Sequence, residues 1–85
     1  MKLINVGFGN VVIAGRIECI KDSGTSPVRR TIRGARDSGR LIDVTLGRKS
    51  RSAVFVDSGH VILSSVHPRT LGNRLKALGV SLKKL

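Results

Sequence analysis

The chain has 85 residues, enough for one small domain, and a formal net charge of +11 at pH 7. A domain of this size buries about 60% of the surface that its unfolded chain exposes, so association with further copies is a natural source of additional burial. The single cysteine, Cys19, excludes an internal disulfide and a cysteine-rich metal framework. So large a charge is typical of a protein that binds nucleic acid, with an anionic membrane surface as the main alternative.

The N-terminus shows no targeting signal. It begins Met1-Lys2-Leu3-Ile4-Asn5, without the apolar run and small-residue cleavage site of a signal peptide. Nowhere does the sequence contain about 20 consecutive apolar residues, the length that a membrane-spanning helix needs. We therefore expect a cytoplasmic location and no membrane partner.

The first quarter of the chain predicts strands. Apolar runs at residues 2–6 and 11–14 flank the turn-forming string Gly7-Phe8-Gly9-Asn10. Gly15 marks a bulge or bend, and a further strand is predicted at 16–20. A turn-rich loop at 21–25 ends this region.

A helix follows, with Ser26 predicted at the N-cap, Pro27 at the first helical position and Gly39 as a left-handed cap. Apolar residues at i, i+4 and i+7 predict its buried stripe: Val28, Ile32 and Ala35. Arginines occupy an adjacent stripe: Arg29, Arg33, Arg36 and Arg40. That stripe predicts a helix lying along or in a major groove, so its members are possible secondary DNA contacts. The alternative is a solvated face on which Arg33 and Asp37 form an ion pair.

Three apolar runs with short connections come next, at residues 41–46, 52–57 and 60–66. Short connections favour antiparallel neighbours, so these runs predict an antiparallel meander. Residues 53–56 and 61–63 are apolar on both faces, and both faces of this sheet therefore need a cover. Two short helices can cover one face. The other is covered either by the N-terminal strands, as a small sandwich, or by a partner molecule.

A last helix is predicted from Pro68 to Gly79, with three buried leucines: Leu71, Leu75 and Leu78. Residues 80–85 form a short basic tail that contains Lys83 and Lys84. Because no linker or repeat is visible, residues 1–79 are predicted to be one DNA-binding, self-associating domain. Its predicted class is α+β: a small antiparallel sheet, made of the N-terminal strands and the three-strand meander, with two short helices.

A second group of cations occupies the turn Gly47-Arg48-Lys49-Ser50-Arg51. Gly47 permits an unusual backbone angle, and a projecting tip can bring its cations to phosphate groups. The alternative is a plain solubilising turn. Arg16, which interrupts an apolar strand just after Gly15, is a third candidate, although a lone arginine in a strand is more often an edge residue.

Aromatic residues are nearly absent, since the chain has only Phe8 and Phe55 and no Trp or Tyr. Proteins that bind single strands stack bases on aromatic side chains, whereas contacts to a duplex backbone need only Arg and Lys. The composition therefore favours double-stranded DNA over RNA or single strands.

No catalytic or metal-binding constellation is visible. The string Gly7-Phe8-Gly9 lacks the third glycine and the ribose-binding acid of a dinucleotide loop. His60, His67 and Cys19 have no recognised metal spacing, and the five acids form no carboxylate pair. We therefore expect no enzyme, no metal, no cofactor and no small-molecule substrate.

Five strings resemble, in their order, the bacterial RemA family of extracellular-matrix regulatory proteins. They are Asn5-Val6-Gly7-Phe8-Gly9-Asn10, Ala35-Arg36-Asp37, Leu41-Ile42-Asp43, Gly47-Arg48-Lys49-Ser50-Arg51-Ser52 and Asp57-Ser58-Gly59-His60-Val61-Ile62-Leu63-Ser64. The resemblance covers nearly all of residues 2–75, and the combination of strings is specific although each string alone is weak. After Gly79 no resemblance is recognisable.

The resemblance implies a DNA-binding transcriptional regulator, with a family role in activating biofilm-matrix genes. It also implies a closed ring of identical subunits whose rim arginines contact duplex DNA, and it favours a partner copy as the cover of the second sheet face. The family's DNA-contacting arginines match Arg16, Arg48 and Lys49, and Lys49 keeps the charge but loses the bidentate geometry of arginine. With Arg51, these residues are the predicted DNA contacts of a protein located at the nucleoid.

Two other functions compete with a regulator. A non-specific, nucleoid-type architectural protein would bind unrelated duplexes equally well. An RNA-associated basic protein would be displaced from DNA by double-stranded RNA. The positive charge of the chain fits both alternatives as well as it fits a regulator. The three functions differ in the nucleic acid that the protein prefers.

Overall fold

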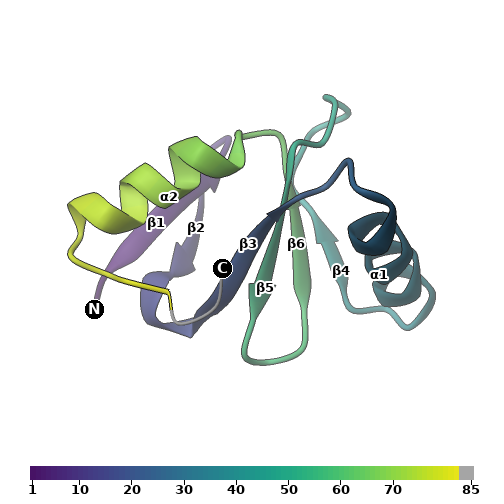
Figure 1. Cartoon of the computed structure of the whole chain (residues 1–85), viewed down its shortest axis with the longest axis horizontal. Helices are drawn as coiled ribbons and strands as arrows, with labels where there is room; N and C mark the ends of the chain where they lie inside the picture. The colour runs from purple at the N-terminus through teal and green to yellow at the C-terminus, as the bar shows by residue number, and fades with distance from the viewer. Residues whose placement is uncertain (83–85) are drawn as a thin grey trace.

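The computed structural model describes residues 1–82, which form three layers (Figure 1). A four-stranded mixed sheet is the middle layer. One helix covers one face of this sheet, and a β-hairpin together with a second helix covers the other. The predicted α+β class is confirmed.

The N-terminal hairpin consists of β1 (Leu3–Gly7) and β2 (Asn10–Ile13), an antiparallel pair separate from the larger sheet. A 3₁₀ turn, η1 (Ala14–Arg16), leads into β3 (Ile17–Asp22). Arg16 therefore lies in a turn just before the strand and not within it. This turn allows the chain to leave the hairpin and enter the four-stranded sheet.

Helix α1 (Ser26–Asp37) begins close to its predicted start, because Pro27 has no N–H to satisfy and its fixed φ suits the first turn. The N-cap residue is Thr25, one position earlier than predicted, and its side chain makes no capping hydrogen bond. Gly39 has a φ of +72°, the left-handed conformation predicted for it. The predicted apolar stripe is buried: Val28, Ile32 and Ala35.

The larger sheet has the strand order β3-β5-β6-β4, where β4 is Leu41–Asp43, β5 is Ser52–Val56 and β6 is Val61–Ser64. β5 pairs antiparallel with β3 and with β6, but β4 pairs parallel with β6. The predicted antiparallel meander is therefore wrong at β4. Residues 44–51 are long enough to cross the roughly 10 Å that two strand spacings occupy, so β6 folds back into the space between β4 and β5.

Both faces of the sheet are covered within this chain, which corrects the expectation that a partner copy covers one of them. α1 packs on one face, against three buried residues: Ala53, Val61 and Leu63. The hairpin and α2 (Pro68–Ala77) share the other face with Val54 and Ile62. The small sandwich is the better description, because the hairpin contributes Ile4 and Val6 to this second core.

Helix α2 brings the two ends of the described chain together (Figure 1). His67 caps it, since its Nδ1 accepts a hydrogen bond from the Arg69 N–H at 3.0 Å. At the other end, the Lys2 ammonium donates to the Leu78 carbonyl at 2.6 Å. α2 is thus fixed to the hairpin that begins the chain.

The described part of the predicted tail is attached to the domain. Val80 and Leu82 are partly buried and pack against the core beneath the hairpin and α2. Lys83 and Lys84 lie outside the described residues. Within residues 1–82 no helix combines the length and apolar character that crossing a membrane requires.

Candidate nucleic-acid interface

The loop at residues 44–51 leaves the sheet after β4 and projects beyond its end (Figure 1). Asp43 anchors the base of this loop, because its Oδ1 accepts hydrogen bonds from the Thr45 hydroxyl at 2.7 Å and from the Thr45 N–H at 2.8 Å. The hydroxyl bond, the N–H bond and the charge of Arg36 hold the pKa of the Asp43 carboxyl below its ordinary value, and partial burial opposes them. Thr45 is buried, so the loop starts from a fixed point.

The first half of the loop is a tight turn, closed by the Arg48 N–H, which donates to the Thr45 carbonyl at 3.0 Å. Its central residues, Leu46 and Gly47, have φ values of +52° and +78°. Positive φ at both central positions is the arrangement of a type I′ turn. The unusual backbone angle predicted at Gly47 is confirmed.

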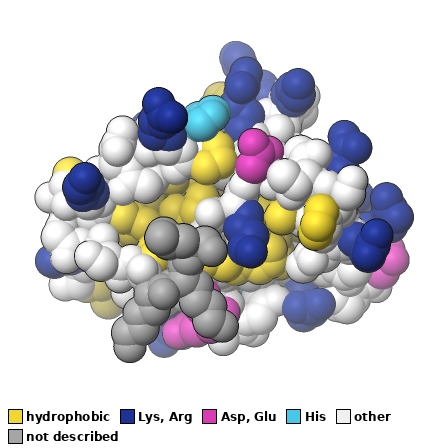
Figure 2. All heavy atoms as spheres, viewed as in Figure 1, with side chains coloured by type: hydrophobic (Ala, Val, Ile, Leu, Met, Phe, Trp, Pro, Cys, Tyr) yellow, Lys and Arg dark blue, Asp and Glu magenta, His cyan; other side chains and the backbone are white. Residues whose placement is uncertain are grey.

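The three predicted DNA-binding cations of this loop lie together. Arg48, Lys49 and Arg51 are all exposed. The Arg51 N–H donates to the Ser64 carbonyl at 2.8 Å, which fixes the end of the loop to β6. Figure 2 shows Lys and Arg side chains gathered at this end of the molecule and over the side where α1 lies.

The tip of the β1–β2 hairpin lies beside this loop. The buried Ser64 hydroxyl holds it there by donating to the Val6 carbonyl at 2.7 Å. Phe8, two residues later, is 48% exposed, and the Arg48 guanidinium carbon lies 5.6 Å from the centroid of its ring. This is a cation–π distance. One open depression unites the two tips, lined by Phe8, Arg48, Lys49, Arg51 and Ser65.

Phe8 lies on this surface but was not among the site residues predicted from the sequence. A signal was present. Phe8 stands between two glycines in a predicted hairpin turn, where Asn, Asp or Gly is the usual choice. An apolar residue at such a position departs from the local preference, and departures of this kind mark functional sites.

Three arginines of α1 form a second basic surface on the other side of the loop. The arginines are Arg29, Arg33 and Arg36, and they line an open depression together with Ser23 and Ser50. The hydroxyl groups of the two serines lie 3.3 Å apart and join the loop to the end of β3. Arg33 and Asp37 do not form the alternative ion pair, because the one ion pair within residues 1–82 joins Arg16 to Asp57.

Arg40 does not share this surface. The helix ends at Asp37, and the Arg40 guanidinium donates to the Gly59 carbonyl at 2.7 Å and to the Ser38 hydroxyl at 2.8 Å. These contacts hold it at the turn between β5 and β6. The predicted stripe of four arginines is therefore a group of three.

Arg16 lies at the opposite end of the sheet from the loop. It precedes β3, whereas Ser23, at the far end of β3, bonds through its N–H to the Arg51 carbonyl at 3.0 Å. The seven residue steps from Arg16 to Ser23 span about 20 Å in an extended strand. One copy therefore does not bring Arg16 together with the loop cations.

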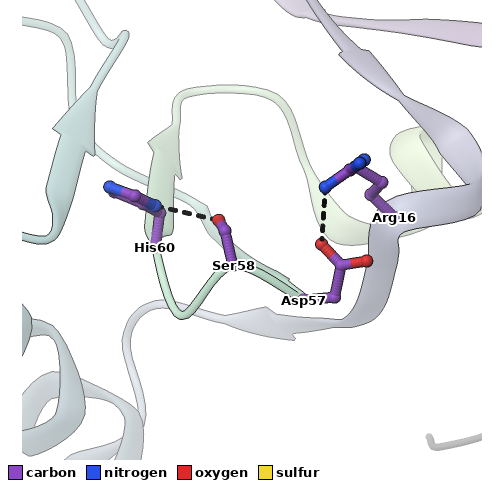
Figure 3. Close-up of polar contacts among 4 residues, drawn as sticks. All are labelled: Arg16, Asp57, Ser58 and His60. Atoms are coloured by element: carbon purple, nitrogen blue, oxygen red, sulfur yellow. Dashed lines mark hydrogen bonds and ion pairs between the residues drawn. The ribbon is translucent and has the colours of Figure 1, made fainter.

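The surroundings of Arg16 are mixed in charge. Its guanidinium lies 3.4 Å from the Asp57 carboxylate, and both side chains are largely exposed (Figure 3). In the same turn the Ser58 hydroxyl and the His60 Nδ1 are 2.8 Å apart. Within residues 1–82 no three His, Cys, Asp or Glu side chains come close enough to hold a metal ion.

Comparison with known proteins places this geometry in a family. The model of the RemA-like family, described as extracellular matrix regulatory protein A-like, matches residues 3–75. The chain belongs to the RemA-like family. Both basic surfaces and Arg16 lie within the matched residues, and the resemblance inferred from the five strings is confirmed.

Relatives of this RemA-like chain are named as regulatory proteins. One from Nitratidesulfovibrio vulgaris is 56% identical over 73 residues, which cover 86% of this chain and 85% of the relative. Another, from Geobacillus kaustophilus, is 52% identical over 75 residues, 88% of this chain and 86% of the relative. A third, from a Synechococcus strain, is 51% identical over 73 residues, with coverage of 86% and 82%.

Proposed function

We propose that this RemA-like protein is a transcriptional regulator that binds duplex DNA. The observation that carries the proposal is the depression at the loop, where Arg48, Lys49 and Arg51 meet and no acid is among the lining residues. A net charge of +11 supports a polyanionic ligand. Membership of a family described as extracellular matrix regulatory supports the activation of biofilm-matrix genes, and binding to the chromosome would place the protein at the nucleoid.

The proposal includes a homo-oligomer, in the form of a closed ring that presents its cations to the duplex. Arg16 and the loop lie at opposite ends of one copy. A site that contains both therefore needs two copies, with the loop end of one next to the Arg16 end of the other on the DNA. The outer face of the hairpin supports self-association, since Leu3 is 48% and Val11 is 56% exposed there. Repetition around a ring would add many weak contacts through effective concentration.

The test compares a duplex enriched by selection from a random pool with an unselected duplex of equal length, over a series of salt concentrations. We expect wild type to prefer the selected duplex and to lose affinity steeply with salt. Arg48→Ala should weaken binding and lower the salt slope by about one. Arg30→Ala is the matched control, because Arg30 is exposed on α1 and lines neither basic depression.

Other outcomes would replace the proposal. Equal affinity for both duplexes would indicate an architectural protein without sequence preference, and stronger competition by double-stranded RNA would indicate an RNA-associated protein. Unchanged binding by Arg48→Ala together with lost binding by Arg33→Ala would move the site to α1. A monomeric mass by light scattering under the binding conditions would contradict the ring.

A further inference from the structure

Two turns of this molecule place a large apolar side chain where asparagine or glycine is usual. At the hairpin tip, Phe8 and Gly9 have φ values of +52° and +77°. At the loop tip, Leu46 and Gly47 repeat this pair with +52° and +78°. The left-handed conformation is unfavourable for a residue with a Cβ atom, and Asn and Asp tolerate it better than Phe or Leu. Both residues therefore reduce the stability of the fold.

Burial does not compensate for this strain. Phe8 is 48% exposed, and Leu46 is 73% exposed. A strained backbone that presents an apolar side chain to solvent indicates an interaction outside the chain. Two independent turns with the same arrangement strengthen that inference.

Both tips lie at the same end of the sheet and among cations. Arg48 links them, because its guanidinium contacts the Phe8 ring at 5.6 Å while its N–H closes the turn that carries Leu46. Lys49 and Arg51 line the same depression as Phe8. Three cations and no acid line this depression, so a polyanion is complementary to it.

We propose that Phe8 and Leu46 are wedges that enter a groove of duplex DNA and separate neighbouring base pairs, while the surrounding cations hold the phosphates. The inference rests on the proposed function and specifies its ligand as a kinked duplex. Proteins that kink DNA combine apolar wedges with Arg and Lys in this way. Flexible pyrimidine–purine steps are easiest to open, so deformability contributes to the choice of site.

The experiment uses substitutions that the turns accept. Phe8→Asn and Leu46→Asn remove the apolar side chain and leave a residue that adopts positive φ readily. Phe8→Leu is the matched control, because it keeps an apolar side chain on the same strained backbone. Energy transfer between dyes at the two ends of a duplex of about 30 base pairs reports the bend. Affinity, its salt slope and thermal unfolding are measured on the same samples.

We expect wild type and Phe8→Leu to bend the duplex. Each asparagine variant should unfold at the same temperature as wild type or a higher one, bend the duplex less and bind it about tenfold more weakly. The salt slope should not change, because the phosphate contacts remain.

Three outcomes would overturn the wedges: binding by wild type without a bend, wild-type bending by both asparagine variants, or a lower salt slope in Phe8→Asn. The last would mean that Phe8 serves only to hold Arg48 in place. A wild-type protein that binds no duplex would refute the proposed function itself, and with it the wedges. The two failures are therefore distinguishable.

Discussion

Asp57 is the acid that neutralises Arg16 in one copy of the protein. The two charged groups lie 3.4 Å apart and are 62% and 49% exposed. An exposed ion pair of this kind contributes at most about 1 kcal/mol to stability. In the proposed complex Arg16 would exchange this carboxylate for a phosphate at little cost, and Asp57 would compete with the phosphate.

Replacing Asp57 by Asn should raise the affinity for duplex DNA by up to about fivefold, because the competing carboxylate is gone. Fluorescence anisotropy at low salt measures this change. Asp37→Asn is the comparison variant, because it removes the same charge at the end of α1, away from Arg16. It should raise the affinity for DNA less. An equal rise in both variants would show that only total charge matters and that Arg16 does not contact DNA.

Local pattern was sufficient for some site residues and insufficient for others. Arg48 and Lys49 could be proposed from sequence, because charged side chains in a glycine-containing turn point to solvent. The place of Phe8 beside Arg48 could not, because it depends on the hydrogen bond between Ser64 and Val6, which are 58 positions apart. No pattern within a short window contains such a contact.

Hydrogen bonds at both ends fix the loop at 44–51. Asp43 and Thr45 fix its base, and the last bond, from Arg51 to Ser64, fixes its end. Between these points the loop carries two of its three cations and Leu46. An ordered base lets a short exposed segment present charge in a defined place.

The stability contributed by Asp43 depends on pH with a defined sign. Folding lowers the pKa of Asp43, so its contribution is complete above the ordinary value of 3.8 and disappears as pH falls through the lower pKa of the folded state. Asp43→Asn should therefore be less stable than wild type near neutral pH, by less than about 1 kcal/mol because the side chain is exposed. Urea unfolding at neutral pH and below pH 3.8 measures the difference. A difference that stays constant over this range would assign it to geometry and not to charge.

Helices were more predictable than strand pairing. Pro27 and Gly39 mark the ends of α1 through local backbone preferences, and the structure has the helix within two positions of both. The partner of β4 was not predictable in this way. β4 pairs parallel with β6 because β6, and not β5, occupies the position beside it. The residues of β4 do not encode this strand order.

At the scale of the whole molecule, the proposed self-association needs a surface that one copy leaves open. The hairpin turns one face to the core and the other to solvent, with Leu3 and Val11 on the solvent side. Exposed apolar residues on the same open face of a hairpin are typical of an interface between proteins.

Val11→Lys should therefore lower the mass measured by light scattering towards that of a monomer. The change lies on an exposed strand position, so the free energy of unfolding of the single copy should change by no more than about 0.5 kcal/mol. Thr31→Lys, at an exposed position of α1, introduces the same charge and should keep the wild-type mass. A Val11→Lys protein with the wild-type mass would place the interface elsewhere, with the edge of β4 and its exposed Ile42 as the next candidate.

The sequence also predicted that the sheet needs a cover on both faces, without identifying both covers. A strand that is apolar on both faces does not show whether a cover comes from the same chain or from another copy. The structure joins β1 and α2, the first and last long elements, into one cover through Ile4, Leu71 and Leu75. A pairing between the two ends of a chain has no local trace in sequence.

This joining of first and last elements has a consequence for synthesis on the ribosome. The hairpin emerges first, yet α2, which completes its core, emerges last. Until then the growing chain exposes the apolar face of β5 and β6 that α2 and the hairpin finally enclose. Contacts between distant segments also slow folding. The nascent protein is therefore most prone to aggregate while β5 and β6 have emerged and α2 has not, and this is the interval in which a chaperone would protect it.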